Sequence, residues 1–201
     1  MKHMLDLFSG LGGASESMIQ NGWEVLRIES NPELSLVENT VIMSVEEVRD
    51  NLLNHLTKGE VPTSPTLIWA SPPCIEFSTG FNAPGPTAQR ASLDFQPSLE
   101  LVKIAKEIID LCQPKYWVIE NVRGAIKHLT PILGEPTLII DSIVLWGRFP
   151  CWGMPPHYQH IKDDAWSSTP LRANIRAKIP FAVSDACRRS IENTRTLDNW
   201  I

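Results

Sequence analysis

Short apolar runs alternate with helix-like stretches along most of this chain. Buried strands are expected near residues 4–8, 24–29, 66–71, 116–120 and 137–147. Helices are expected near residues 14–21, 45–57, 97–112 and 182–193. This alternation predicts an α/β fold, in which a mostly parallel, doubly wound sheet carries helices on both faces.

The composition is that of one folded unit. The chain has 201 residues, of which 43% are apolar, and a chain of this size buries roughly 70% of its unfolded surface. No linker or repeat divides residues 1–201, so we expect a single domain over the whole of this range. Residues 148–178 are rich in Pro, Trp and His and lack a clear period. We expect them to form a long loop or a small recognition insert.

Charge and cysteine usage narrow the class of protein. The net charge of −5 argues against a broad non-specific DNA-binding surface. No stretch approaches the ~20 apolar residues of a membrane span, and the start of the chain is not a signal peptide. The four cysteines show no C-x-x-C spacing, so we expect no metal, reduced thiols and a cytoplasmic location. They are Cys74, Cys112, Cys151 and Cys187, and the second and fourth fall in helical patterns typical of a core.

A glycine loop follows the first predicted strand. Ser9-Gly10-Leu11-Gly12-Gly13 precedes a helical stretch, which is the strand–loop–helix start of a nucleotide-binding unit. The spacing differs from G-x-G-x-x-G, so it favours a ligand without a pyrophosphate. Glu29 ends the next strand about 20 residues later, a position that suits a ribose diol. A side chain at Gly12 is expected to enter the path of the ligand. The alternative is a plain glycine turn with a surface glutamate.

A cysteine follows the third predicted strand on a turn of two prolines. Proline cannot donate to a sheet ladder, so the strand stops at Ser71 and places Cys74 beyond its end, where open α/β sheets bind ligands. The position suits a nucleophile, although most free cysteines are small buried residues. The following segment 75–86, rich in Gly and Pro, is typical of a loop that closes over a substrate.

A carboxylate and an amide follow the fourth predicted strand. Tyr116–Val122 is an apolar run that ends in Glu120-Asn121-Val122. A carboxyl group at the sheet edge can protonate or hydrogen-bond a heterocycle. Asn121 is expected to fix the strand-end backbone. The alternative is an ordinary strand end with a solvated Glu120.

Together these segments resemble the DNA (cytosine-5) methyltransferase family, in the family's order. The resemblance implies a Rossmann-like fold that binds S-adenosyl-L-methionine, with Cys74 as the attacking thiolate and Glu120 on the cytosine ring. The implied cofactor residues are Asp6, Phe8, Ser9, Gly10, Leu11, Gly12, Gly13, Glu29, Ser30 and Pro72. The implied substrate-binding residues are Pro73, Ser78, Asn121 and Val122.

The chain departs from the family's pattern in four places. No aspartate follows a third strand to meet the adenine, and only Ser44 and Glu46 stand near that position. The Gln-x-Arg-x-Arg motif has no copy, so Arg148 is taken as the catalytic arginine by its place in the chain, with Arg90 and Arg123 as alternatives. The late Gly-Asn motif is also missing, and 179–184 is expected to replace it before the final helix. There is no room for a large target-recognition domain, which is typical of a small phage-like or stand-alone member.

The resemblance implies an enzyme that methylates C5 of cytosine in DNA through a covalent cysteine–C6 intermediate. Its substrate would be a flipped or single-stranded cytosine, and a homodimer or a separate recognition subunit would supply what the chain lacks. Three alternatives stay open. One is a non-enzymatic or regulatory subunit with a relict pocket, another an enzyme that modifies an exocyclic amine, and the third an enzyme that transfers a different group.

Overall fold

A seven-stranded sheet forms the centre of the protein. The structure, a computed structural model, describes residues 1–54, 61, 64–154, 158–159 and 169–194. The strand order is β3-β2-β1-β4-β5-β7-β6. The strands are β1 (His3–Leu7), β2 (Glu24–Glu29), β3 (Thr40–Ile42), β4 (Leu67–Ala70), β5 (Tyr116–Val122), β6 (Leu138–Ile140) and β7 (Ile143–Arg148). Strands β1 to β5 pair in parallel, whereas β7 pairs antiparallel with both β5 and β6.

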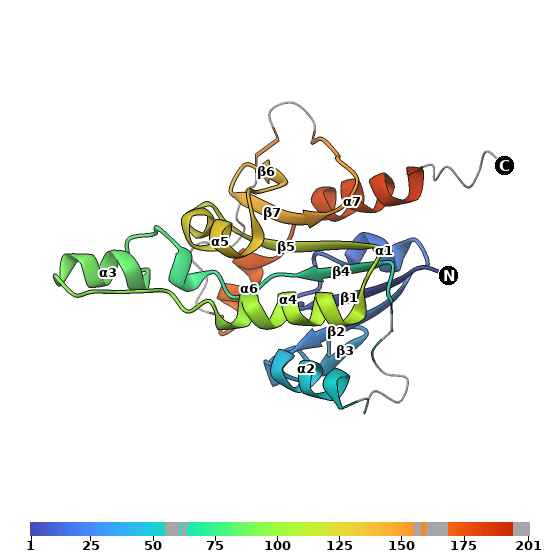
Figure 1. Cartoon of the computed structure of the whole chain (residues 1–201), viewed down its shortest axis with the longest axis horizontal. Helices are drawn as coiled ribbons and strands as arrows, with labels where there is room; N and C mark the ends of the chain where they lie inside the picture. Colours follow the sequence, from blue (N-terminus) through green and yellow to red (C-terminus); the bar gives the residue numbers. More distant parts are fainter. Residues whose placement is uncertain (55–60, 62–63, 155–157, 160–168, 195–201) are drawn as a thin grey trace.

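Helices lie on both faces of this sheet, as Figure 1 shows. They are α1 (Glu16–Gln20), α2 (Val45–Leu53), α3 (Pro84–Arg90), α4 (Glu100–Cys112), α5 (Ile126–Leu133), α6 (Arg172–Ala177) and α7 (Phe181–Asn193). Three short 3-10 helices are η1 (Pro32–Leu34), η2 (Ile75–Phe77) and η3 (Arg123–Ala125). Residues of α1 and α7 pack on one face and residues of α2 and α4 on the other. The predicted Rossmann-like, doubly wound α/β fold is confirmed.

The strands are apolar on both faces because helices cover both faces. In β1, Leu5 and Leu7 pack with residues of α2 and α4, whereas Met4 packs with residues of α1 and α7. This alternation follows from the two-residue period of a strand. A parallel sheet that is covered on both sides therefore consists of nearly continuous hydrophobic strands. This is the pattern from which the strands were predicted.

Several elements differ from the predicted ones. The expected strand at 137–147 is a hairpin of β6 and β7, and its turn contains Asp141 in the left-handed region at φ 51°. The three-residue β3 was not predicted, and neither were α3, α5 and α6. Helix α3 begins at Pro84 inside the segment expected to be a loop, because proline fits the first turn of a helix. Residues 55–57 of the second expected helix lie outside the described residues.

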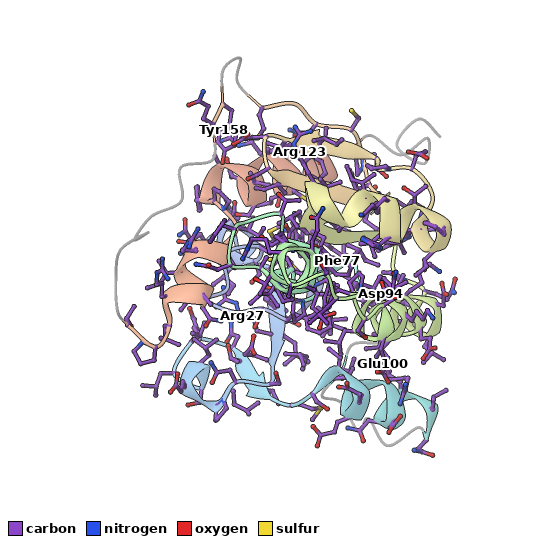
Figure 2. All side chains as sticks on the ribbon, turned by 90° about the vertical axis from the view of Figure 1, so that its left-hand side faces the viewer. Arg27, Phe77, Asp94, Glu100, Arg123 and Tyr158 are labelled. Atoms are coloured by element: carbon purple, nitrogen blue, oxygen red, sulfur yellow. The ribbon has the colours of Figure 1, made fainter. Side chains whose placement is uncertain are left out.

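The position of the first strand creates the place where a ligand can bind. The chain runs outward from β1 through β2 to β3, then returns to β4 on the other side of β1. Such a reversal leaves a crevice beyond the carboxyl ends of the two central strands. Helix α3 projects from this edge in Figure 1, and Figure 2 looks at the same edge with α3 pointing toward the viewer.

Two of the cysteines are core residues, as predicted. Cys112 on α4 and Cys187 on α7 are buried, and burial raises the pKa of Cys112 to about 11 and raises that of Cys187 further. Of the expected insert at 148–178, residues 155–157 and 160–168 lie outside the described residues. In the part of the chain that the structure describes, no helix has the length and apolar character needed to cross a membrane.

Candidate cofactor and cytosine site

The register of the sheet brings the four predicted motifs to one edge. Leu7, the last residue of β1, pairs with Ile28 of β2 and with Ala70 of β4. Ala70 in turn pairs with Ile119 of β5. The residues that follow these positions are Phe8, Glu29, Ser71 and Glu120, so the glycine loop, the acid, the cysteine turn and the Glu-Asn pair begin at the same level.

The glycine loop is anchored by the acid at the end of β2. The backbone N–H of Gly10 donates to Glu29 Oε2 at 2.9 Å, and the N–H of Asn31 donates to Glu29 Oε1 at 2.9 Å. Each carboxylate oxygen keeps a further acceptor site. The Glu29 side chain is therefore oriented by the backbone on both sides and can still accept ribose hydroxyls.

A buried polar network supports the same loop from below. Arg27 on β2 donates from Nε to Ser15 Oγ at 2.8 Å and from Nη2 to the Gly12 carbonyl at 2.9 Å. Ser15 Oγ donates to Asp6 Oδ2 at 2.6 Å. Gly12 has φ +71°, and a Cβ there would lie 2.3 Å from Arg27 Cζ. A side chain at residue 12 would therefore first collide with the Arg27 guanidinium, and not with the ligand as expected from the sequence.

Two buried polar atoms at this loop fit a polar ligand. Asp6 Oδ1 and Ser9 Oγ are buried and have no hydrogen-bond partner among the described residues. Burial raises the pKa of Asp6 to about 6, although the Ser15 hydrogen bond and the Arg27 charge oppose the rise and the Glu29 charge adds to it. Buried polar groups are usually paired, so unpaired atoms beside a glycine loop are consistent with a cofactor that supplies the partners.

A pocket of about 210 Å³ opens beside the loop. Its lining is mostly apolar and comes from the residue after β1, the end of β2, the start of α2 and the residues before it, the cysteine turn and α4. The lining residues are Phe8, Ile28, Ser30, Met43, Ser44, Val45, Glu46, Pro73 and Leu101. A flat heterocycle suits an apolar pocket with a few polar groups at its rim. Pro73, predicted to bind the substrate, lines this pocket, whereas Pro72, predicted to bind the cofactor, is buried and is not among the lining residues.

The two polar residues next to a short third strand prove to lie in this pocket. The Ser44 side chain is already used, because it caps α2 in a capping box with Glu47. Glu46 follows in the first turn of α2 and is half-buried. Glu46 is therefore the acidic residue in the lining of this pocket.

A segment from the end of the chain closes the back of the glycine loop. A Cβ on Gly13 would lie 2.3 Å from the carbonyl oxygen of Ile179, and the ammonium of Lys178 pairs with Glu16 at 2.9 Å. Helix α7 begins two residues after Ile179. The segment expected to replace the missing Gly-Asn motif thus packs on the loop and leads directly into the final helix.

The cysteine turn is held by a buried amide from the next strand. Asn121 is fully buried, donates from Nδ2 to the Pro72 carbonyl at 3.1 Å and accepts from the Val122 N–H at 2.9 Å. Its place among the substrate-binding residues is therefore corrected, and its expected role in fixing the backbone agrees with the geometry. Cys74 is half-buried and is the N-cap residue directly before η2, and Ser78 is the C-cap residue directly after it. Glu120 precedes Asn121 and is half-buried at the same edge.

Arg148 lies away from the cysteine. It pairs with Trp117 at the beginning of β5, whereas Glu120 pairs with Leu145, because β7 runs antiparallel to β5. Its guanidinium donates to the carbonyl of Pro114. The structure thus separates Arg148 from the other candidates, and its assignment to the cytosine is corrected. Arg123 directly follows β5 at the correct edge, where its Nε donates to the Asp141 carbonyl at 2.6 Å.

Sequence reasoning missed Arg27, Ser15 and the apolar lining of the pocket. Arg27 carried a usable signal, since a charged residue inside an otherwise apolar strand is almost never buried without a partner. Met43 and Leu101 gave none, because they come from separate elements that only the fold brings together. The site therefore combines a glycine loop, an acid, a pocket and a thiol at the crevice of a doubly wound sheet, which is the arrangement of a nucleotide-cofactor-dependent transferase.

Comparisons with known proteins give the same class. The family described as C-5 cytosine-specific DNA methylase matches residues 2–133. The chain is 31% identical to the type II methyltransferase M.HgiGI of Herpetosiphon aurantiacus over 124 residues, which cover 60% of this chain and 90% of that protein. The chain therefore belongs to the C-5 cytosine-specific DNA methylase family, whose methyl donor is S-adenosylmethionine, and the predicted recognition and cofactor are confirmed.

Two viral proteins are similar over more of the chain. The orphan methyltransferase M.SPRI of Bacillus phage SPR is 30% identical over 197 residues, covering 87% of this chain and 42% of that protein. The "Probable DNA (cytosine-5)-methyltransferase" of Frog virus 3 (isolate Goorha) is 30% identical over 153 residues, covering 72% of this chain and 65% of that protein. The chain thus spans less than half of the phage protein and about two thirds of the frog virus protein.

Proposed function

We propose that this protein transfers a methyl group to C5 of cytosine in DNA and that Cys74 forms a transient covalent bond to C6. The observation that carries the proposal is the register of β1, β4 and β5. It sets a thiol and a carboxyl group near the ends of the neighbouring strands β4 and β5, and the glycine loop follows β1, which pairs with β4. This one edge of the sheet therefore offers the nucleophile, the acid and the cofactor loop that the reaction needs.

The residues present fit the cofactor. The Glu29 carboxylate would take the ribose hydroxyls, the pocket that contains Glu46 would take the adenine, and the loop with Asp6 and Ser9 would take the methionine part. These assignments rest on the unpaired buried atoms, on the anchored carboxylate and on the apolar lining. S-adenosylmethionine, when bound, supplies an electrophilic methyl group.

Cys74 supplies the activation that cytosine lacks. C5 of cytosine is a poor nucleophile until a group adds to C6, and the thiolate is the form of cysteine that attacks. A bond between Cys74 Sγ and C6 pushes electron density toward C5 as the ring gains negative charge. After C5 has been alkylated, loss of the C5 proton to a base and breakage of the Sγ–C6 bond restore the ring and the thiolate.

Glu120 would stabilise the ring during the attack. A carboxyl group that is protonated, or that shares a proton with N3, offsets the negative charge that develops on the ring. Asn121 supports this step indirectly, because its bond to the Pro72 carbonyl fixes the cysteine turn relative to β5. The positions of thiol and carboxyl group are thus coupled by one buried amide.

The helical arm after Cys74 faces the same side as the thiol and would contact DNA. Helix α3 projects from this edge, as Figures 1 and 2 show. Phe81 is 73% exposed before it and Leu93 is 65% exposed after it. Arg90 lies with its guanidinium 3.9 Å from the centre of the Phe81 ring. An exposed aromatic ring with a cation is suited to a base that has left the stack.

A suicide substrate tests the covalent step. An oligonucleotide with 5-fluorocytosine should trap Cys74, because fluorine cannot leave as a proton does and elimination stalls. Mass spectrometry of the protease-digested complex should find the adduct on the peptide that contains Cys74. Absence of the adduct, together with 5-methylcytosine formed by Cys74→Ala, would contradict the proposal. N4-methylcytosine or N6-methyladenine as the product would favour an amino-methyltransferase instead.

A further inference from the structure

A guanidinium is buried inside the second strand of the sheet. Arg27 is 5% exposed, and its three donor groups bond to Ser15 Oγ, the Gly12 carbonyl and, at 2.8 Å, the Glu38 carbonyl. Removing a charged group from water is costly, and well-packed apolar residues often replace buried ion pairs without loss of stability. The fold alone therefore gives no reason for an arginine here, but two of the three groups that the guanidinium binds lie in the glycine loop or just after it.

We propose that Arg27 is a positioning residue for the cofactor: it fixes the Gly12 carbonyl and the Ser15 hydroxyl, so that the glycine loop keeps the shape that receives S-adenosylmethionine. The proposal rests on the cofactor role given to this loop under the proposed function. Figure 2 shows Arg27 on the side of α3 opposite to Arg123. The guanidinium lies beneath the loop, and its low exposure means that it acts through the loop and not by direct contact.

The hydrogen bonds of this network run in one direction. Ser15 has one hydroxyl proton and two acceptors near it, Asp6 Oδ2 at 2.6 Å and the Gly12 carbonyl at 3.4 Å. Because Arg27 Nε donates to Ser15 Oγ, the proton is directed to the nearer Asp6 oxygen. The Gly12 carbonyl is then left to Arg27 Nη2. Without the guanidinium, the hydroxyl and the carbonyl would be free to bond to each other and the loop would relax.

The second strand holds the loop at two points. Arg27 and Glu29 are two residues apart on β2, so their side chains lie on the same face. Arg27 binds the Gly12 carbonyl and Glu29 binds the Gly10 N–H. The loop between these points is short and has two glycines in the left-handed region. Fixing both ends of such a loop removes conformational freedom that the cofactor would otherwise have to remove on binding.

Calorimetry of cofactor binding without DNA tests this role. S-adenosylmethionine and S-adenosylhomocysteine would be titrated into the wild-type protein and into Arg27→Lys, Arg27→Met, Ser15→Ala and Arg188→Met. Losing a hydrogen bond to a charged group should weaken binding ~10- to 100-fold in Arg27→Met. Arg27→Lys should restore part of the loss, since an ammonium keeps the charge but cannot span both acceptors. At saturating cofactor, kcat on DNA should change by less than about threefold while KM for the cofactor rises.

Arg188 is a matched control for a purely structural arginine. It lies on α7, its side chain is 12% exposed, and it bonds to Ser17, Asp185 and Glu192. Arg188→Met should lower the melting temperature without changing cofactor affinity. Equal loss of affinity in Arg188→Met and Arg27→Met would show a general loss of stability and overturn the proposal. Wild-type affinity in a folded Arg27→Lys would overturn it as well.

A double mutant keeps the test decisive if Arg27→Met does not fold. Arg27→Lys and Ser15→Ala act on one network, so the double variant should lose less affinity than the two single losses combined. Additive losses would contradict the network. If wild-type protein binds neither ligand, the cofactor assignment falls and this proposal with it. If wild-type protein binds but the Arg27 variants bind equally well, only this proposal falls.

Discussion

The two halves of the proposed catalytic edge, the cofactor side and the substrate side, are built differently. On the cofactor side, the loop after β1 is bonded to Arg27 and Glu29 and supported by Ser15. On the substrate side, the buried Asn121 side chain donates to the Pro72 carbonyl in the cysteine turn after β4, and the chain then continues into α3, which projects from the rest of the structure. The cofactor side is largely buried and is held by several side-chain hydrogen bonds, whereas the substrate side presents exposed apolar side chains.

This contrast corresponds to the two ligands. A small cofactor is bound best by a loop that already has its final shape, since ordering costs affinity. A base that must leave a duplex needs an open approach and a segment that can adapt to the polymer. We therefore expect changes on the cofactor side to affect affinity and changes on the substrate side to affect turnover.

The largest effect separates the two halves completely. Cys74→Ala removes the nucleophile, and turnover should fall by ~10⁴-fold or more. The affinity for S-adenosylhomocysteine should stay within about twofold, because the loop network does not include Cys74. Methyl-transfer rates and calorimetry on the same protein measure both. Cys151→Ala changes an exposed cysteine and should leave both quantities unaltered. A comparable loss of cofactor affinity in Cys74→Ala would show that the two halves are not separate.

A smaller effect on the same side is expected from Glu120. Glu120→Gln keeps a hydrogen-bonding group but cannot protonate N3, so catalysis should fall ~10²- to 10⁴-fold. Cofactor binding should change much less. Single-turnover methylation at saturating cofactor measures the chemical step without product release. Equal rates for the two proteins would remove Glu120 from the mechanism.

The sequence predicted the substrate side and the cofactor side unequally well. Strands β1, β2, β4 and β5 were predicted because they are covered on both faces and therefore read as apolar runs, and their ends placed Cys74, Glu120 and Glu29 at one edge. The arm α3 was not predicted, since Pro84-Gly85-Pro86 is typical of a turn and a short exposed helix has no apolar stripe. Arg148 was assigned by its order in the chain, and the β6–β7 hairpin reversed the direction that this order implied.

The contacts that support the glycine loop could not be predicted, although Arg27 stood out as a charged residue inside an apolar strand. Arg27, Ser15 and Asp6 come from three segments whose contacts depend on how α1 turns back onto β1 and β2. A pattern of apolar residues shows which face is buried, but not which polar groups meet there. The pocket residues Met43 and Leu101 are of the same kind, since neither belongs to a motif.

The next prediction uses the charge of the cofactor side. Because burial raises the pKa of Asp6 from 3.8 to about 6, the folded protein holds this proton more tightly than the unfolded chain. The resulting stabilisation is fully present below pH 3.8 and is lost as the pH rises through 6. The difference between the two pKa values corresponds to about 3 kcal/mol of unfolding free energy. Ser15, Arg27 and Glu29 are the groups that act on this carboxyl group.

Urea denaturation of wild type and Asp6→Asn at several pH values measures this effect. Relative to wild type, the free energy of unfolding of Asp6→Asn should rise by about 1.5 kcal/mol between pH 5 and pH 8, because only the wild type loses the proton. Asp185 is the control of opposite sign, since hydrogen bonding to Arg188 lowers its pKa. Relative to wild type, Asp185→Asn should become less stable as the pH rises from acid, where wild-type Asp185 is protonated. A flat difference for Asp6→Asn would show that its carboxyl group titrates normally.

The smallest expected effect distinguishes Arg123, directly after β5, from Arg148 at the end of β7. Arg123 follows β5 at the edge that carries Glu120, whereas Arg148 lies at the other end of the same strand pair. Arg123→Ala should lower kcat/KM for DNA by ~10-fold, the value of one arginine contact to a base or phosphate, with cofactor affinity unchanged. Arg148→Ala should leave kcat/KM within about twofold and reduce only stability, because its guanidinium binds the Pro114 carbonyl. Steady-state methylation of one oligonucleotide at two salt concentrations measures both variants, and a phosphate contact by Arg123 would also reduce the salt dependence. The reverse order of effects would mean that the β6–β7 hairpin, and not the end of β5, supplies the arginine for the substrate.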